Sequence, residues 1–186
     1  MLIPPFDIRS IRILFLRNAW VFICWSIFLS SAHAQFVRSP WPAKSAIPSF
    51  SWTDLNGVTW SSKNQLGKVV IINFWATWCA PCLVELPTLQ TLGEISDPDQ
   101  VSVISVNVRQ LSSQVQRFVS TTGFNLPVVL DPKGELSKSF QVRIYPTTIL
   151  IDPQGVARWR IEGDVDWTSP QVNSWIQTLG GPKFLR

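Results

Sequence analysis

The sequence predicts an α/β domain with a mixed central sheet and helices on both faces. Apolar runs of strand length, rich in β-branched residues, alternate with segments of helical periodicity, an order typical of parallel strands joined by right-handed crossovers. One predicted hairpin precedes this alternation and a second one follows it. The strands of the alternation are 69–72, 101–108 and 126–130, and the hairpins cover 50–60 and 147–161.

Residues 1–34 have the pattern of a secretory signal peptide. Three arginines come first, an almost unbroken apolar run covers 19–29, and Ala32-His33-Ala34 fits the small-x-small form of a cleavage site. The run is short for a membrane span, and an uncleaved anchor is the second interpretation. We therefore expect a periplasmic or otherwise extracytoplasmic protein, soluble after cleavage or tethered by this segment, in a compartment where disulfides persist.

The rest of the chain fits one domain, 49–186, preceded by an extended proline-rich linker at 35–48. The net charge of +4 at pH 7 is mild, and no basic run supports nucleic-acid binding. Cys24 belongs to the apolar run of the signal. Residues 35–186 therefore contain only two cysteines, Cys79 and Cys82, and no histidine.

A short hairpin and a buried strand open the domain. Residues 50–53 alternate apolar and polar side chains, Asn56-Gly57 is a strong turn signal, and a strand returns over 58–60. Val69-Val70-Ile71-Ile72 is apolar and β-branched throughout, which predicts a buried strand.

A helix follows the buried strand, and the cysteine pair lies at its start. Pro81 fits a first helical turn, where a missing N–H is harmless, and leucines recur at helical spacing before Gly93, the expected end. Unpaired backbone N–H groups and the helix dipole favour a thiolate at Cys79, so we expect the pKa of this thiol to be lowered. Cys79 should attack a partner disulfide, and the inward-facing Cys82 should resolve the mixed disulfide.

Turn and cap residues divide the second half of the chain. Gly123 is a helix stop, two Asp-Pro-x-Gly sequences at 131–134 and 152–155 fit type I turns, and Ser169-Pro170 is a cap followed by a first-turn proline. The predicted elements are strands at 101–108, 126–130, 147–151 and 156–161, and helices at 112–122, 136–140 and 170–179.

Two other roles for the cysteine pair find less support. A structural zinc site usually takes four Cys or His ligands, and residues 35–186 supply two. A purely structural disulfide that closes so short a loop would remove little chain entropy.

Two stretches of the chain carry a family resemblance. The first is 73–82 (NFWATWCAPC), followed by Glu85 and Pro87, and the second is 145–152 (YPTTILID). With these motifs the chain resembles the thioredoxin-like proteins, and most closely the bacterial extracytoplasmic reductases of the TlpA/ResA/DsbE group. The resemblance covers roughly 47–179. It implies a thioredoxin-like fold with an N-terminal β-hairpin and an inserted βα element around 112–122.

The resemblance also implies roles for residues near the cysteines. Pro146 would be a cis-proline facing the disulfide, and the backbone of Tyr145 would bind an extended substrate. Trp78 should form the rim of the active surface, whereas Trp75 should pack in the core. The expected catalytic residues are Cys79, Cys82, Glu85 and Pro146, and the expected substrate-binding residues are Trp78, Ala80, Pro81 and Tyr145.

Glu85 is the acid expected near the resolving cysteine. One helical turn beyond Cys82, its carboxylate would raise the pKa of that thiol by like-charge repulsion and could accept its proton. The alternative is a solvated helix glutamate. Thioredoxin has a buried aspartate where this chain has Asn73, and an amide cannot exchange a proton. A second departure is Ile144, where many relatives carry glycine.

These observations predict an exported thiol–disulfide oxidoreductase that reduces disulfides in partner proteins. The resemblance suggests apocytochrome c or metal-site cysteines as clients, and a membrane carrier as the source of electrons. We expect a monomer without cofactor or metal. The alternatives are a disulfide donor of the same fold and, less favoured because residues 35–186 contain no histidine, a Cu(I) chaperone. A peroxidase of the related fold is excluded, since neither cysteine follows a Pro-x-x-x-Thr-x-x-Cys pattern.

Overall fold

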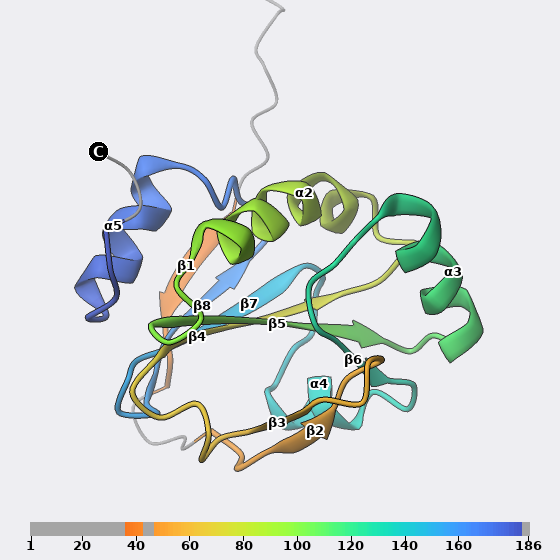
Figure 1. Ribbon diagram of the computed structural model, residues 1–186, viewed down its shortest axis with the longest axis horizontal. Helices are drawn as coiled ribbons and strands as arrows, with labels where there is room; N and C mark the ends of the chain where they lie inside the picture. Colours follow the sequence, from red (N-terminus) through yellow and green to blue (C-terminus); the bar gives the residue numbers. More distant parts are fainter. Residues whose placement is uncertain (1–35, 43–46, 184–186) are drawn as a thin grey trace, which may run out of the picture. The chain divides into compact units, whose positions relative to one another are not determined.

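A computed structural model describes residues 36–42 and 47–183 of the chain (Figure 1). The predicted signal peptide at 1–34 lies outside the described residues. Among the residues described, no helix is long and apolar enough to cross a membrane.

Six strands form the central sheet, in the order β1-β8-β7-β4-β5-β6. β4, β5 and β6 are parallel, and β7, β8 and β1 continue the sheet as antiparallel neighbours. The strands are β1 (Val37–Pro40), β4 (Val69–Trp75), β5 (Val101–Val108), β6 (Val128–Asp131), β7 (Thr147–Ile151) and β8 (Ala157–Glu162). The separate hairpin consists of β2 (Ser51–Thr53) and β3 (Thr59–Ser61), and the helices are α2 (Ala80–Ile95), α3 (Ser112–Thr122), α4 (Glu135–Ser139) and α5 (Pro170–Thr178).

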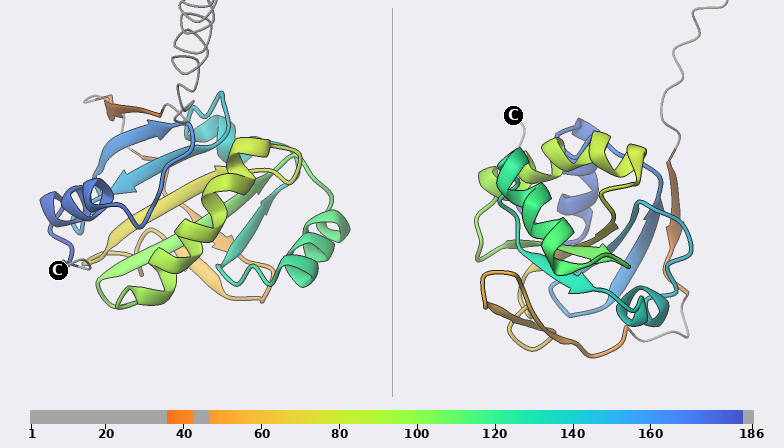
Figure 2. Two further views of the ribbon diagram at one scale, coloured as in Figure 1. Left: turned by 90° about the horizontal axis from the view of Figure 1, so that it is seen from above. Right: turned by 90° about the vertical axis from the view of Figure 1, so that its right-hand side faces the viewer.

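Helices cover both faces of the sheet, as the sequence predicts. α5, α2 and α3 lie side by side over one face (Figure 2), and α4 lies with the β2–β3 hairpin on the other (Figure 1). β4 is buried along its whole length because its side chains alternate between two cores. Val69, Ile71 and Trp75 pack on the α2 side, and Val70, Ile72 and Phe74 pack on the hairpin side.

The structure differs from the expected linker at Val37–Pro40, which form the edge strand β1. Arg38 lies opposite Ile161 of β8. Its guanidinium lies over the rings of Trp159 and Trp175, 4.7 and 5.0 Å from their centroids. An edge strand tolerates Pro40 because one side of the strand has no partner. Thus β1 forms through contacts with residues more than a hundred positions away, which local composition does not reveal.

Gly93 does not end the helix that carries the cysteines, because α2 continues to Ile95. A Cβ at Gly93 would lie 2.5 Å from Cδ2 of Leu126. The glycine therefore permits close packing between α2 and the segment before β6. The helix ends one turn later, where the backbone N–H of Ser96 donates to the carbonyl of Leu92.

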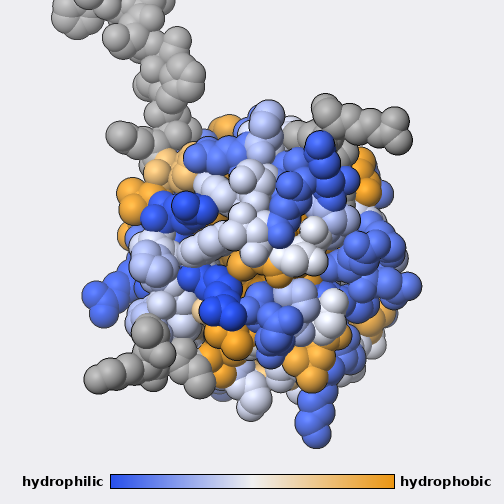
Figure 3. Space-filling view, turned by 90° about the vertical axis from the view of Figure 1, so that its left-hand side faces the viewer, coloured by the Kyte–Doolittle hydropathy of each residue, from blue (hydrophilic) through white to orange (hydrophobic). Residues whose placement is uncertain are grey.

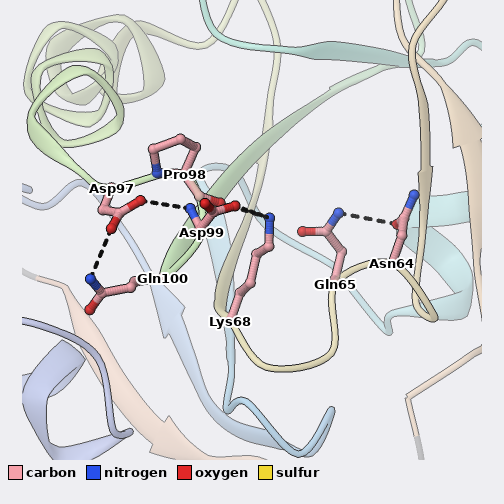
Figure 4. A network of polar contacts seen from close by, with 7 residues as sticks. All are labelled: Asn64, Gln65, Lys68, Asp97, Pro98, Asp99 and Gln100. Carbon is pink, nitrogen blue, oxygen red and sulfur yellow. Dashed lines mark hydrogen bonds and ion pairs between the residues drawn. The ribbon is translucent and has the colours of Figure 1, made fainter.

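The amino ends of β4 and β5 lie at the opposite end of the sheet from the cysteines. There the Nζ of Lys68 donates to the carbonyl of Pro98 at 2.7 Å. Asp97 accepts from the backbone N–H of Asp99 and from the side chain of Gln100, both at 2.9 Å (Figure 4). These bonds hold the turn between α2 and β5. On this side of the molecule hydrophilic residues predominate (Figure 3).

Candidate active site

The two cysteines lie where β4 leads into α2. Cys79 is the N-cap residue of α2, and Pro81 stands in its first turn. The two sulfur atoms form a disulfide of 2.10 Å, and the backbone N–H of Cys82 donates to Sγ of Cys79 at 3.3 Å. Cys82 is fully enclosed, whereas 5% of the Cys79 surface is exposed. Cys79 is therefore the sulfur that an external thiolate can reach.

Tyr145 and Pro146 lie beside the cysteine loop because β7 runs antiparallel to β4. Phe74 stands opposite Thr147, so the carboxyl end of β4 and the residues before β7 share one end of the sheet. The peptide bond between Tyr145 and Pro146 is cis. Trp78 is 61% exposed, and its ring meets that of Tyr145 edge-on with the centroids 5.8 Å apart.

Exposed apolar residues lie near the cysteine pair in the chain and in the segment before β7, and we call them the apolar rim. Its residues come from the cysteine loop, the first turns of α2 and the segment before β7. They are Trp78, Ala80, Pro81, Leu83, Val84 and Ile144. Trp75 belongs instead to the core, where it contacts Phe118 and Phe124. An exposed patch of this kind beside a reactive group is typical of a surface that contacts other proteins.

Glu85 is buried inside the fold rather than solvated on the helix surface. It is 1% exposed and shares the inner face of α2 with Cys82. Its Oε1 accepts from Nδ2 of Asn73 at 2.6 Å. Its Oε2 accepts from the backbone N–H of Val165 at 3.2 Å and from the indole N–H of Trp167 at 3.1 Å. The carboxylate is thus held by donors from β4 and from the loop between β8 and α5.

Burial raises the pKa of Glu85 from its ordinary value of 4.5 to about 7. The hydrogen bonds from Asn73, Trp167 and Val165 act in the opposite direction, and the nearby charge of Asp164 adds to the rise. Glu85 can therefore exchange a proton near neutral pH, where a carboxyl group of ordinary pKa would be fully ionised.

A second buried network fixes the loop before Cys79. Oε1 of Gln110 accepts from the backbone N–H of Thr77 at 2.7 Å and from Nδ2 of Asn107 at 3.0 Å. Nε2 of Gln110 donates to the hydroxyl of Thr77 at 2.6 Å. Gln110 is not among the site residues expected from the sequence, because its partner Thr77 lies 33 positions earlier in the chain and no local signal marks it.

The part of the chain that the structure describes contains no group of three or more His, Cys, Asp or Glu residues placed to hold a metal ion. The Cys79–Cys82 disulfide is a pair of sulfur atoms that can be reduced and reoxidised by thiol–disulfide exchange. The fold and this site together define a thioredoxin-like thiol–disulfide oxidoreductase.

Comparisons with known proteins give the same class. The chain belongs to the AhpC/TSA family, which matches residues 43–160. The thiol-disulfide oxidoreductase ResA of Geobacillus kaustophilus is 35% identical over 135 residues, or 73% of this chain and 76% of that protein. ResA of Geobacillus thermodenitrificans is 31% identical over 171 residues, or 92% and 94% of the two chains.

A solved structure supports the fold directly. StoA from Bacillus subtilis matches with a TM-score of 0.61 and 31% identity, covering 72% of this chain and 98% of that one. The predicted thioredoxin-like fold, the family resemblance and the enzyme class are confirmed.

Proposed function

We propose that this thiol–disulfide oxidoreductase works as an exported reductant of disulfides in other proteins. The observation that carries the proposal is the buried Glu85 one helical turn from Cys82, within a stretch from Asn73 to Thr91 that contains no basic residue. A strong oxidant of this kind owes its potential to a stabilised reduced form, in which a thiolate is favoured. A negative charge beside the pair opposes that stabilisation and favours donation of electrons.

The proposed reaction has two exchange steps. The Cys79 thiolate attacks a client disulfide, forms a mixed disulfide and releases the first client thiolate. Glu85 then takes the proton of the Cys82 thiol, and the Cys82 thiolate attacks the Cys79 sulfur. The second client thiolate leaves and the Cys79–Cys82 disulfide forms, so that two electrons have passed to the client. The client thiolates take protons from water, Glu85 returns its proton to water, and an external dithiol reduces the pair again.

The proposed clients are exported proteins whose cysteines must be reduced before they bind haem or a metal. The proposed electron source is a membrane dithiol carrier. Family membership supports the reaction class, and the signal-like pattern of 1–34 supports export. The apolar rim supports a protein substrate, for which Trp78 would supply apolar contact and the backbone of Tyr145 would supply hydrogen bonds.

The reduction potential of the Cys79/Cys82 pair tests the direction of electron flow. The purified protein is equilibrated with thiol–disulfide buffers, quenched, and assayed for free thiols by alkylation and mass spectrometry. A reductant is expected to have a potential of about −230 mV or lower. A value near that of a strong oxidant, about −120 mV, would overturn the proposal and make the protein a disulfide donor.

Export is tested independently by cell fractionation and N-terminal sequencing. A new N-terminus at Gln35, or an uncleaved protein held at the outer side of the membrane, supports export. A full-length protein in the cytosol contradicts it.

A further inference from the structure

The amide of Asn73 is the only side chain that faces Oε1 of Glu85 among the hydrogen bonds of the described residues. Asn73 is fully buried in the middle of β4. Its Nδ2 donates to Oε1 of Glu85 at 2.6 Å and to the hydroxyl of Thr148, on β7, at 2.9 Å. Its Oδ1 is buried and has no hydrogen-bond partner among the described residues. A buried, unpaired amide oxygen is costly and calls for an explanation.

The two carboxyl oxygens of Glu85 differ in whether their neighbours can accept a hydrogen bond from a proton bound to that oxygen. Oε2 faces the backbone N–H of Val165 and the indole N–H of Trp167. Both groups can only donate, so a proton on Oε2 would meet two donors. Oε1 faces a side-chain amide, which can present either its N–H₂ or its carbonyl oxygen. When Glu85 gains a proton, the proton therefore belongs on Oε1, where the amide can turn to accept it.

Thr148 makes such a turn of the Asn73 amide feasible. In the orientation of the Asn73 amide seen in the structure, the hydroxyl of Thr148 accepts a hydrogen bond from Nδ2 of Asn73. After rotation of the amide by half a turn, the same hydroxyl can donate to Oδ1, because a hydroxyl is both donor and acceptor. Oδ1, unpaired now, would then accept from Thr148 and from the protonated Glu85. Oδ1 thus gains two partners when Glu85 is neutral, and the N–H₂ group takes the position that Oδ1 leaves.

Among the groups around Glu85, the side-chain amide of Asn73 is the one that can either donate a hydrogen bond to Glu85 or accept one from it. Asp164, in the loop between β8 and α5, acts on Glu85 by repulsion, and the Cys82 thiol lies one turn earlier on α2. From β4 and β7 the contacts are the uncharged side chains of Asn73 and Thr148. Among the described residues, the side-chain and backbone groups that donate to Glu85 are all uncharged.

We infer that Asn73 is a positioning residue whose amide turns over as Glu85 takes and releases the proton of Cys82. This inference rests on the proposed function, in which Glu85 is the base for the resolving thiol. The N–H₂ group stabilises the carboxylate before the transfer. The carbonyl oxygen receives the new O–H after the transfer, while Cys82 attacks as the thiolate. Electrons move only between sulfur atoms, and Asn73 itself neither gains nor loses a proton.

Stopped-flow reaction of the reduced protein with a chromogenic aromatic disulfide separates the two steps. The attack of Cys79 releases one coloured thiolate, and the attack of Cys82 on the mixed disulfide releases a second. The aromatic thiolate leaves without a proton, so the pH profile of the second phase reports on Cys82 and its base. We compare wild type with Asn73→Leu, and use Ser105→Ala as control because Ser105 lies opposite Asn73 on β5 and bonds to Pro127.

For Asn73→Leu we expect the pH profile of the second-phase rate to have its midpoint about one to two pH units higher than in wild type. The reason is that the Glu85 carboxylate loses a charge-assisted hydrogen bond. The midpoint of the first phase should stay in place, as should both midpoints in Ser105→Ala. An unchanged second midpoint in Asn73→Leu would overturn the inference. Absence of the two phases in wild type would instead overturn the proposed function, so the two failures are distinguishable.

NMR of the reduced wild-type protein tests the inference without a core substitution. The side-chain amide signals of Asn73 should shift with the same pH midpoint as the carboxyl carbon of Glu85. In Glu85→Gln the Asn73 signals should not titrate over this range. Asn73 signals that stay constant in wild type while Glu85 titrates would contradict the turnover of the amide.

Discussion

The indole N–H of Trp167 donates a hydrogen bond to Oε2 of Glu85 at 3.1 Å, although 82 positions separate the two residues in the chain. The backbone N–H of Val165 reaches the same oxygen, and Asn73 holds the other one. Donors from two distant segments, β4 and the loop between β8 and α5, therefore hold one carboxyl group beside the cysteine pair.

Trp167→Phe should raise the pKa of Glu85 above its value of about 7. The substitution keeps an aromatic ring in the core but removes a donor to the carboxylate, and a shift of about one pH unit or more is expected. NMR titration of the Glu85 carboxyl carbon measures it. Trp175→Phe is the control, since Trp175 packs against Phe36 and Arg38. Equal shifts in the two variants would contradict the role of the Trp167 bond.

Glu85 should make the folded protein less stable as the pH rises. The pKa of Glu85 is about 7 in the folded protein and 4.5 for an ordinary glutamate. The stabilisation that the protonated Glu85 gives to the folded state is therefore fully present below pH 4.5 and is lost as the pH rises through about 7. The loss is about 3 kcal/mol of unfolding free energy. Urea unfolding of the oxidised protein on both sides of this range measures it. Glu85→Gln should lack this decline, and parallel pH curves for the two proteins would argue against it.

Cys82→Ser should trap the mixed disulfide between Cys79 and a client. Without the resolving thiol the first exchange proceeds and the second does not, so turnover with a protein disulfide falls to background. Mass spectrometry of the non-reduced adduct measures the trapping. The matched variant Cys79→Ser should give neither turnover nor adduct. Adducts formed equally through Cys82 would contradict the assigned order of attack.

Gln110→Leu should loosen the loop that carries Trp78 and Cys79. The change leaves the half-buried backbone N–H of Thr77 without its acceptor, which costs about 1 kcal/mol of unfolding free energy. Hydrogen exchange at the Thr77 amide should become faster, and urea unfolding should show the loss. Gln116→Leu, on the exposed surface of α3, is the control and should cost less. Unchanged exchange at Thr77 would show that Gln110 does not hold the loop.

Arg38→Ala should lower stability without changing the redox properties. The guanidinium lies over Trp159 and Trp175 at the edge of the sheet, and loss of these contacts should cost about 1 kcal/mol. Denaturant unfolding measures the loss, and thiol–disulfide equilibration measures the potential of the cysteine pair. A changed potential would mean that β1 is coupled to the site, contrary to expectation.

The features that the sequence predicts well are those with local signals. Asn56-Gly57 predicts the β2–β3 hairpin, and Ser169 caps α5 by accepting from the backbone N–H of Val172. The position of Cys79 at the start of α2 follows from the strand before it and from Pro81. In each case the residues that decide the structure lie within a few positions of one another.

The features that escape prediction depend on contacts between distant segments. The motif identifies Glu85, but its burial depends on Val165 and Trp167, about 80 positions later. Glycine often ends a helix, yet Gly93 lies inside α2, and the absence of a side chain there leaves room for Leu126. Local pattern cannot separate a glycine that ends a helix from one that permits close packing.

The enclosure of Cys82 has a kinetic consequence. Since Cys79 retains some exposure and Cys82 retains none, in the proposed reaction a client and the electron-supplying dithiol must both approach Cys79. The two cannot react with Cys79 at the same time, so each must depart before the other reacts. Turnover should therefore follow a ping-pong scheme in which client and electron donor compete for the enzyme, and an excess of either should slow the half-reaction of the other.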